Sequence, residues 1–518
     1  MAKILVDINV ILDAILNRDD DSEKLINKLI KTNHELFITS SMIPILDYFL
    51  KKYKANKNEF KKKFLSRFKV ISTTGYEAIN SLDFKEGEDA LIALSFKRIA
   101  GDGIIISRNK NLDSFGLKLL SPQEALNDKN LLEDDEIDNI SLLDLAKEYR
   151  NIIEEIDNAI LNCISNARYI LGPEVKKLEE QIAGYIDTKY AVGVSSGTDA
   201  LVLSLRALAI KRKKKEFFDK EDLIITTPFT FTATGEAILR AGATPLFVDI
   251  DLNTFNINPD EITKAIEKYG TKVKGIIPVH LYGQPCNMDK ITKIAKEYDL
   301  FVVEDCAQSL GAKWKSKQTG SFGNTGCFSF FPSKPLGGFG DGGMITTNDE
   351  ELYELLLMLR KHGGKDKYNV DYIGYNARLD TIQAAILLVK LKYLDNLNRK
   401  RRKIAKFYNE KLKGVDSIIP PYEDKNAYHV YHQYTVRVLS NKRDEIHKKL
   451  KEKSIQTMIY YPMPLHKMKV FLKNGMEVFG NLSNTEKAVK EVLSLPIEPL
   501  YEKEIFEKVV KVLKEEIK

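Results

Sequence analysis

The chain is poor in cysteine. Its 518 residues include four, none in a CxxC pair: Cys163, Cys286, Cys306 and Cys327. Secreted disulfide scaffolds need a higher density of cysteine, and structural zinc sites need ligands at paired spacings. The sequence therefore argues against both classes and fits a reducing compartment.

Long uncharged hydrophobic runs are also missing. No apolar stretch reaches the roughly eighteen residues that a membrane-spanning helix requires. The apolar stretch at the N-terminus contains Asp7 and Asp13, and the core of a signal peptide would not tolerate these charges. We therefore expect a cytoplasmic protein with no membrane partner.

The net charge is small for so long a chain. Lysine and arginine number 79, and aspartate and glutamate number 73, which gives +6. An imbalance of this size does not by itself indicate nucleic-acid binding. Two basic clusters, at residues 51–63 and 211–215, are more typical of solvated helix faces or loops than of phosphate-binding tracks.

An acidic segment divides the chain. Residues 128–139 (DKNLLEDDEIDN) contain six acidic residues, one lysine and no aromatic residue, so this segment repels itself and buries little. We predict that it links a small domain, residues 1–127, to a larger region. In the small domain short β-branched runs alternate with helical patterns, which is typical of an α/β fold.

The larger region repeats this alternation with longer elements. Amphipathic stretches separate near-continuous apolar runs at residues 223–227, 245–249, 273–280 and 301–304. Such runs are typical of strands that helices cover on both faces. We predict a mostly parallel sheet, whose ligands bind at the carboxyl ends of the strands.

Lys334 is the first candidate for chemistry. It lies in CFSFFPSKPLGGFGDGGMITT (327–347), between an aromatic run and a glycine-rich turn. A partly desolvated lysine loses proton affinity and becomes a nucleophile toward carbonyl groups. A lone lysine in a turn is more often an ordinary surface residue, so the interpretation depends on its companions.

Two companions are polar groups that follow apolar runs. The segment 195–200 (SSGTDA) opens a helical stretch, where backbone N–H groups and the hydroxyls of Ser196 and Thr198 can bind a phosphate. Asp305 follows the run at 301–304, and a carboxylate there can keep a pyridine nitrogen protonated. Either feature alone is equally typical of a helix cap.

A third companion is aromatic. Phe231 precedes a helical stretch and can stack on a flat ring, although a core position is the ordinary alternative. Phosphate cup, stacking ring, carboxylate and lysine occur in this order along the chain, and together they are the contacts that pyridoxal 5'-phosphate requires. The sequence therefore predicts that cofactor.

The same residues belong to longer motifs. From about residue 140 to the C-terminus the chain resembles the DegT/DnrJ/StrS sugar aminotransferases, which share fold type I of the pyridoxal-phosphate-dependent transferases. The resemblance implies a cofactor-binding large domain with a mostly parallel sheet, residues 140–390, and a C-terminal α+β small domain, residues 391–518. The motifs include LLDLAKEYRNI (142–152), SSGTDAL (195–201), PFTFTAT (228–234), VHLYGQP (279–285), VEDCAQSLGA (303–312), FSFFPSKPLGGFGDGG (328–343) and GYNARLDTIQAA (374–385).

The resemblance also implies roles for single residues. Lys334 would hold the cofactor covalently and Asp305 would contact the pyridine nitrogen, as the two catalytic residues. Gln308 would lie near the phenolic oxygen of the ring. Asn376 would reach the phosphate from the neighbouring subunit, so the site would need a homodimer. The other phosphate ligands would be Gly197, Thr198 and Ser329.

The expected reaction is transfer of an amino group from glutamate to a nucleotide-linked ketosugar. The segments 429–438 (HVYHQYTVRV) and 457–466 (TMIYYPMPLH) are most similar to the branch that aminates UDP-3-oxo-N-acetylglucosaminuronate for surface polysaccharides. Arg378 could pair with the uronate carboxylate or a nucleotide phosphate. His432, Tyr431 and His466 are further substrate candidates, although each could equally be a core or dimer contact. Related branches that act on dTDP-3-oxo or UDP-4-oxo sugars remain open.

The small domain carries spaced aspartates near its strand ends. Clustered carboxylates repel one another and favour a hard divalent cation, which can activate water against a phosphodiester. Residues 3–126 resemble PIN-domain nucleases, which implies Mg²⁺ or Mn²⁺ and an RNA partner. The implied metal ligands are Asp7, Asp47, Asp89 and Asp113, with Asn9 and Asn109 as supporting groups.

Two features depart from the PIN pattern. Ile8 stands where a small hydroxyl residue is usual, and residues 85–87 (KEG) lengthen the acidic segment. An active nuclease, whether as a second or as the main activity, and a docking domain therefore both remain open.

Overall fold

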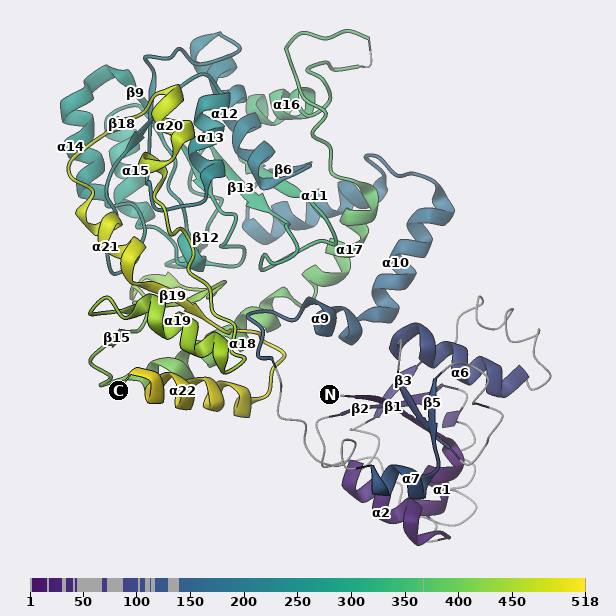
Figure 1. The fold of residues 1–518 in the computed structure, drawn as a ribbon. Helices are drawn as coiled ribbons and strands as arrows, with labels where there is room; N and C mark the ends of the chain where they lie inside the picture. Colours follow the sequence, from purple (N-terminus) through teal and green to yellow (C-terminus); the bar gives the residue numbers. More distant parts are fainter. Residues whose placement is uncertain are drawn as a thin grey trace. The chain divides into compact units, whose positions relative to one another are not determined.

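The computed structural model describes residues 2–15, 18–29, 34–40, 42–43, 68–71, 87–100, 103–107, 112, 117–128, 139–366 and 368–517. The chain divides into two compact units, Met1–Asp138 and Asn139–Lys518. Each unit has its own hydrophobic core and is described by itself (Figure 1).

The N-terminal unit contains a parallel five-stranded sheet, in the order β3-β2-β1-β4-β5. Ile4 and Val6 of β1 pack with helices α1, α2 and α7, whereas Leu5 packs with α6. Alternate residues of a strand point to opposite faces, so helices cover both faces of this sheet (Figure 1). The elements are β1 (Lys3–Val6), α1 (Ile8–Ile15), α2 (Asp20–Leu29), β2 (Glu35–Thr39), β3 (Phe68–Ile71), α6 (Gly87–Ala100), β4 (Ile104–Ile106), β5 (Lys118–Leu120) and α7 (Pro122–Asn127).

The C-terminal unit is built on an eight-stranded sheet, in the order β18-β8-β7-β9-β10-β13-β14-β6. Within it β14 is antiparallel to both of its neighbours, and the other pairings are parallel. The predicted mostly parallel sheet is therefore confirmed. The strands are β6 (Tyr190–Val194), β7 (Leu223–Thr226), β8 (Thr244–Phe247), β9 (Val273–Ile276), β10 (Phe301–Asp305), β13 (Thr325–Ser329), β14 (Gly343–Thr347) and β18 (Glu477–Val478).

Helices cover both faces of this sheet. Phe301 and Val303 of β10 pack in the same core cluster as α12 (Gly197–Lys213), and Val302 packs in the cluster of α14 (Pro259–Tyr269) and α15 (Met288–Glu297). Eleven consecutive residues of α12, from Ala200 to Ile210, are buried. A helix that is buried all round lies in the interior, so α12 and the sheet form a stable base for the loops at the strand ends.

Further helices and two smaller sheets complete the unit; one of these sheets has the order β12 (Lys317–Gln318), β11 (Lys313–Trp314) and β16 (Ala427–Tyr428). α9 (Leu145–Asn151), α10 (Ile153–Asn166) and α11 (Pro173–Ile186) precede β6, and α13 (Thr232–Arg240), α16 (Glu350–Leu359) and α17 (Thr381–Leu391) lie between strands or follow them. The C-terminal part has a three-stranded antiparallel sheet with α18 (Leu394–Leu412), α19 (Arg443–Glu452), α21 (Ser483–Glu491) and α22 (Lys503–Ile517). Its strands, in sheet order, are β15 (Ile418–Ile419), β17 (Tyr434–Val438) and β19 (Val492–Leu495).

One C-terminal segment returns to the large sheet. β18 pairs with β8, and α20 (Lys469–Asn474) lies near it in Figure 1. α20 places Phe471 against Phe247, with ring centroids 5.5 Å apart. No helix among the described residues is both long and apolar enough to cross a membrane.

Candidate active site

Three parallel strands of the large sheet end at the same edge. Their last residues are Val194 in β6, Asp305 in β10 and Ser329 in β13. β14 begins at this edge with Gly343, which pairs with Ser329 on one side and Val194 on the other. The loops that follow these strands therefore converge where ligands of parallel sheets bind.

The start of α12 and the end of β13 form a narrow cup. Ser196 caps α12 by accepting a hydrogen bond from the Asp199 backbone N–H at 3.0 Å. A Cβ on Gly197 would lie 2.7 Å from the Ser329 Cβ, so only glycine allows this close approach. The structure thus brings Gly197, Thr198 and Ser329 together at the positive end of a 17-residue helix, which suits a phosphate. The Ser196 hydroxyl, expected to bind phosphate as well, is used in the cap.

Asp305 is buried at the end of β10. Its Oδ2 accepts a hydrogen bond from Thr234 Oγ1 at 2.8 Å, and its Oδ1 accepts one from the Ala307 backbone N–H at 3.2 Å. Burial raises the pKa of Asp305, while these hydrogen bonds and the Lys334 charge act in the opposite direction. The carboxylate is therefore held by donors in a dry place, where its charge acts strongly on a neighbour.

Phe231 directly precedes α13, the helix whose Thr234 donates to this carboxylate. It is the N-cap residue of that helix, whose first turn carries Thr234, and 60 % of Phe231 is exposed. An exposed ring of this size is available to stack on a flat ligand. Thr234 was not among the predicted site residues, although its position three residues after Phe231 places both on one face of the helix start.

Lys334 lies in the turn after β13. Its backbone N–H donates to the Phe331 carbonyl at 2.8 Å. Burial lowers the pKa of Lys334 to about 8, and the Asp305 carboxylate opposes this shift. A substantial fraction of the amine is therefore neutral near physiological pH, as nucleophilic attack on a carbonyl requires.

Gln308 is fixed at both ends of its amide. Its Oε1 accepts a hydrogen bond from the Tyr282 backbone N–H at 2.8 Å, and its Nε2 donates to the Tyr461 hydroxyl at 2.7 Å. Tyr461 has a φ of 61° directly before Pro462, a conformation that is unfavourable for a bulky residue. Tyr461 was not predicted as a site residue, and the fixed amide leaves its second N–H for a ligand.

Asn376 and Arg378 flank the cup of their own chain. The Ser195 backbone N–H donates to the Ala377 carbonyl at 3.2 Å, and the backbone of Arg378 forms an antiparallel β-bridge with Val194. Ala377 is buried, and Asn376 is exposed. The side chains of residues 376 and 378 therefore lie on the same side of this extended segment.

The other substrate candidates fall into different surroundings. His432 is buried, and burial followed by the charges of Lys334 and Arg401 holds its pKa well below the usual range. His466 Nε2 lies 3.0 Å from Glu486 Oε1, next to the loop after β7. Tyr431 donates its hydroxyl to Glu423 at 3.2 Å. Of the three, His432 is the one in the electrostatic environment of Lys334.

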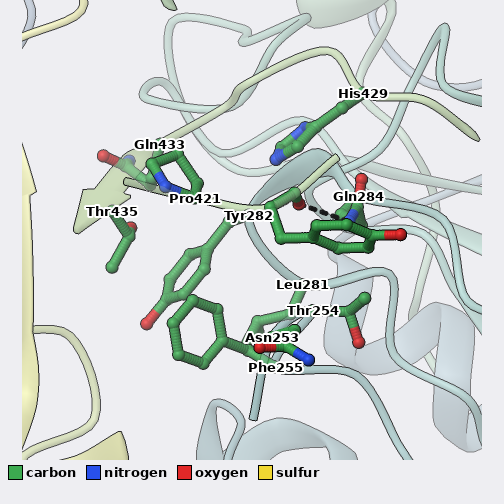
Figure 2. Close-up of a pocket in the computed structure, with 11 residues that line it drawn as sticks. Asn253, Thr254, Phe255, Leu281, Tyr282, Gln284, Pro421, His429, Gln433 and Thr435 are labelled. Carbon is green, nitrogen blue, oxygen red and sulfur yellow. Dashed lines mark hydrogen bonds between the residues drawn. The ribbon is translucent and has the colours of Figure 1, made fainter. Parts of the chain in front are cut away.

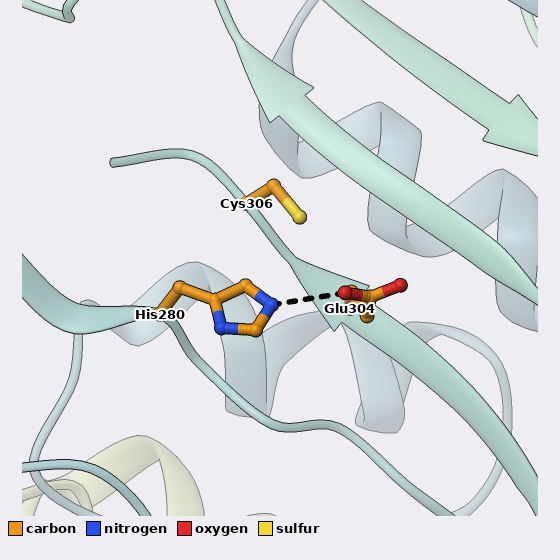
Figure 3. A group of neighbouring side chains, drawn as sticks. All are labelled: His280, Glu304 and Cys306. Carbon is orange, nitrogen blue, oxygen red and sulfur yellow. Dashed lines mark hydrogen bonds and ion pairs between the residues drawn. The ribbon is translucent and has the colours of Figure 1, made fainter. Parts of the chain in front are cut away.

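A buried His280, Glu304 and Cys306 group resembles a metal site (Figure 3). His280 Nδ1 accepts a hydrogen bond from a backbone N–H, so Nε2 carries the proton and donates to Glu304 at 3.1 Å. Glu304 also accepts three backbone N–H bonds from the loop at residues 320–323. Burial raises the pKa of the Cys306 thiol well above its usual value. These ligand atoms already have partners. The group therefore fixes Glu304, the residue before Asp305, to the loop at residues 320–323, and does not bind an ion.

Tyr282 also lines a small enclosed cavity (Figure 2). Within the described part of the chain, its hydroxyl and Gln284 Oε1 have no hydrogen-bond partner, while Gln284 Nε2 donates to the Tyr422 carbonyl at 2.7 Å. The cavity measures about 10 Å³, close to the space that one water molecule needs. It is therefore too small for a sugar substrate.

In the N-terminal unit, Asp7 lies at the carboxyl end of the central strand β1. Its Oδ2 accepts a hydrogen bond from Ser107 at the end of β4, and its Oδ1 accepts one from the Asn9 backbone N–H at 3.2 Å. Asp47, Asp113 and Asn109 lie outside the described residues, and of Asp89 only the backbone, in α6, is described. The predicted metal site remains a prediction.

The fold and the residues at this edge of the sheet together define the class of protein. A mostly parallel sheet with a half-buried lysine, a buried aspartate and a helix N-terminus at one edge is the arrangement of fold type I aminotransferases, and solved structures of that class match the chain. S. venezuelae DesV has a TM-score of 0.69 and 36% identity, covering 73% of this chain and 99% of DesV. NtdA from Bacillus subtilis, solved with bound PMP, has a TM-score of 0.66 and 29% identity, covering 82% of this chain and 96% of NtdA.

The chain belongs to the DegT/DnrJ/EryC1/StrS aminotransferase family, whose model matches residues 150–514. It is 40% identical to a UDP-N-acetyl-3-dehydro-alpha-D-glucosamine 3-aminotransferase of Acidithiobacillus ferrooxidans, covering 72% of this chain and 97% of the relative. It is 43% identical to dTDP-3-amino-3,6-dideoxy-alpha-D-galactopyranose transaminase of Aneurinibacillus thermoaerophilus, covering 72% of this chain and 98% of the relative. It is 39% identical to UDP-2-acetamido-2-deoxy-3-oxo-D-glucuronate aminotransferase of Pseudomonas aeruginosa, covering 70% and 95%. The protein is therefore an aminotransferase.

Proposed function

We propose that the C-terminal unit transfers the amino group of glutamate to C3 of a nucleotide-linked 3-ketosugar, with pyridoxal 5'-phosphate as cofactor. The observation that supports this proposal most directly is the pKa of Lys334. Burial lowers this pKa at the edge of the sheet that also holds Asp305. A reactive amine beside a buried carboxylate suits capture of an aldehyde on a pyridine ring.

The residues at the edge fit each part of this cofactor. Gly197, Thr198 and Ser329 would bind the phosphate, because a Cβ at Gly197 would close their cup. The exposed Phe231 ring would stack on the pyridine, and Asp305 would hold its nitrogen protonated. Gln308 would donate to the phenolic oxygen, and Lys334 would hold the aldehyde carbon. When bound, the cofactor supplies an electron sink for charge that develops at the donor carbon.

The chain's own part in the reaction is to hold and move protons. Lys334, with a pKa of about 8, can accept a proton from the donor carbon and release it near neutral pH. The hydrogen bonds from Thr234 and the Ala307 backbone favour the charged form of Asp305 and oppose the effect of its burial on the pKa. The dry surroundings of Lys334 strengthen the attraction between the two side chains.

The position of amination is supported by the relatives. All three that are described above are named for amino or oxo groups at C3, on UDP sugars in two cases and on a dTDP sugar in one. Our substrate of choice is UDP-3-oxo-N-acetylglucosaminuronate, for surface polysaccharide biosynthesis, with Arg378 on its carboxylate or on a nucleotide phosphate. Another UDP- or dTDP-ketosugar is the alternative. The exposed Asn376 would reach the phosphate of the partner subunit in a homodimer.

The test is to supply glutamate and a panel of UDP- and dTDP-linked ketosugars to the protein loaded with pyridoxal phosphate. We expect amination of the 3-oxo sugars, and loss of turnover in Lys334→Ala but not in Lys473→Ala, an exposed lysine on α20. Turnover by Lys334→Ala would overturn the proposal. Amination of a 4-oxo hexose without the 3-oxo uronate would contradict the position C3 and the choice of sugar, but not the transfer chemistry.

For the N-terminal unit we propose a metal-dependent PIN-like ribonuclease. The supporting observation is Asp7 at the carboxyl end of the central strand of a parallel sheet. Its site would hold Mg²⁺ or Mn²⁺ with Asp47, Asp89 and Asp113. We expect cleavage of RNA that requires the metal and disappears in Asp89→Asn, while Lys334→Ala leaves it unchanged; metal-independent cleavage would contradict this proposal.

A further inference from the structure

Two tyrosines hold the amide of Gln308 in one orientation. The Tyr282 backbone N–H donates to Gln308 Oε1 at 2.8 Å, and Gln308 Nε2 donates to the Tyr461 hydroxyl at 2.7 Å. A rotated amide would turn its NH₂ group toward the Tyr282 N–H, so that two donors would face each other. Gln308 is buried and lies three residues after Asp305, so the fixed amide belongs to the interior of the site.

Both tyrosines have an unfavourable backbone conformation. The φ angle is 58° at Tyr282 and 61° at Tyr461, in the left-handed region that bulky residues seldom adopt. The two rings also stack, with centroids 6.2 Å apart and an interplanar angle of 20°. Such conformations persist only where the surrounding contacts impose them, and they cluster at functional sites. Here the strained backbone coincides with the two residues that hold Gln308.

The segment that carries Tyr461 is anchored at both ends. Met458 forms two backbone hydrogen bonds with Ser494 of β19, at 3.1 and 2.8 Å. At the other end, the Leu465 backbone N–H donates to the Pro228 carbonyl at 2.9 Å, in the loop after β7. The hydroxyl of Tyr461 therefore has a defined position, as a residue that orients another side chain requires.

The Tyr461 hydroxyl is suited to accept this hydrogen bond. Burial raises the pKa of Tyr461, the hydrogen bond from Gln308 opposes this shift, and the Asp305 charge supports it. The hydroxyl is therefore neutral near pH 7, where it accepts from Gln308 and keeps its own proton. An amide nitrogen carries two N–H bonds, so once Tyr461 takes one of them the direction of the other is set.

We propose that Tyr461 is a positioning residue, whose hydroxyl directs the second N–H of Gln308 to the phenolic oxygen of the bound cofactor. This inference rests on the proposed function, which places that oxygen at Gln308. A donor at the oxygen stabilises its negative charge and weakens its attraction for the proton of the imine that joins the cofactor to Lys334. Tyr461 therefore acts on the protonation of the imine through Gln308, without a contact of its own to the cofactor.

Other ionisable groups surround Lys334 and also act on the imine. The Asp305 carboxylate favours its protonated form, and burial keeps His432 neutral. The charged residues that line the small cavity beside Lys334 are Glu148, Arg401 and Glu498. Among the described residues none of these groups forms a hydrogen bond with the side chain of Tyr461 or Gln308, so a change at Tyr461 leaves their contributions in place.

The experiment titrates the absorbance of the protein loaded with pyridoxal 5'-phosphate against pH, without glutamate or sugar. The midpoint reports the pKa of the imine. We expect Tyr461→Phe to raise this pKa by roughly half a unit to one unit, because an amide that is no longer held donates a weaker hydrogen bond to the phenolic oxygen. Tyr460→Phe is the matched control and should leave the midpoint unchanged. Its ring packs in the same aromatic cluster, and its hydroxyl has no hydrogen-bond partner among the described residues.

A double variant shows whether Tyr461 acts through Gln308. Gln308→Ala should raise the midpoint at least as much as Tyr461→Phe does. Adding Tyr461→Phe to Gln308→Ala should then change nothing more, because the effects of residues that act together are not additive. Additive shifts would overturn the inference by placing the Tyr461 hydroxyl on the cofactor itself. An unchanged midpoint in Tyr461→Phe, whatever its Tm, would overturn it as well and leave the hydroxyl a purely structural role.

The titration also keeps this inference separate from the proposed function. It needs the bound cofactor but no amino transfer, so a protein that forms the imine and aminates no ketosugar would contradict the proposed function and leave this result standing. If no imine forms at Lys334 in the unmodified protein, both proposals fail together. A normal titration of the unmodified protein that Tyr461→Phe does not shift overturns the inference alone.

Discussion

At the scale of single residues, Lys334 predicts a pH dependence. Its amine should react with pyridoxal phosphate as the neutral form, with a rate that rises with pH and levels off above about 8. An ordinary exposed lysine would level off only near pH ~10.4. Below the pKa the rate should fall roughly tenfold per pH unit, since the neutral fraction does. Borohydride trapping followed by peptide mass spectrometry measures this rate for residue 334.

Asp305→Asn gives the control for this titration. The Asp305 carboxylate favours the charged amine, so its removal should lower the pKa of Lys334 and move the midpoint to lower pH. A midpoint that stays at its original pH, or moves upward, would show that the two side chains do not interact as the structure places them.

Thr234 predicts a second effect on the same carboxylate. Its hydroxyl donates to Asp305 and lowers the pKa of that residue, so Thr234→Ala should raise the Asp305 pKa further. A weaker charge would hold a protonated pyridine less well, and we expect cofactor affinity to fall roughly tenfold. Fluorescence titration with pyridoxal phosphate measures the Kd. Thr234→Ser keeps the hydroxyl and should restore affinity; a failure to do so would point to lost packing instead.

The position of a site residue can be predicted from the sequence only where the neighbouring residues determine it. Asp305 and the segment 195–198 could be placed at one edge from the sequence, because each directly follows an apolar run that forms a strand of a parallel sheet. The hydrogen bond between Gln308 and Tyr461 joins residues 153 positions apart, and no local pattern marks it.

At the scale of elements, Gly197 joins the start of α12 to the end of β13. Gly197→Ala would place a Cβ 2.7 Å from Ser329, so the helix and the strand would have to separate. We expect unfolding free energy to fall by about 1–3 kcal/mol, as overpacking does, and phosphate affinity to fall with it. Urea unfolding and titration with pyridoxal phosphate measure the two effects.

Gly184→Ala in α11 is the matched control. No atom lies within 4 Å of a Cβ at Gly184, and alanine is the better helix former by roughly 0.5–1 kcal/mol. We expect equal or higher stability there and unchanged cofactor binding. If both variants bind pyridoxal phosphate as the unmodified protein does, the cup does not hold its phosphate.

Strand patterns were more informative than domain boundaries. The run at residues 301–304 was predicted as a strand covered on both faces, and Phe301 and Val302 do pack into opposite cores. β18 and α20 belong to residues 391–518 but pack on the large sheet. A two-residue strand has no periodicity of its own, and its pairing with β8 depends on long-range contacts.

At the scale of the whole molecule, the relatives separate the two units. The family model begins at residue 150, and the relatives described above are covered over 95–98% of their own lengths by 70–72% of this chain. The parallel sheet of the N-terminal unit therefore lies outside the family match. Its topology supports the predicted α/β class, but its chemistry depends on aspartates at positions 47, 89 and 113, whose side chains lie outside the description.

Asn376 makes the oligomeric state testable. The proposal assigns its amide to the phosphate of the partner subunit, whereas Lys334 serves its own chain. In a dimer of one Lys334→Ala chain and one Asn376→Ala chain, one site would combine the intact Lys334 with the partner's intact side chain at position 376, and the other would lack both. Heterodimers purified through two different tags should then have roughly half of the activity of the unmodified dimer, because closed twofold symmetry gives two equivalent sites. If Asn376 acts within its own chain, beside Ser195, each site would lack one residue and the heterodimer would be as inactive as either parent. A monomer in sedimentation at assay concentrations, with full activity, would contradict a shared site altogether.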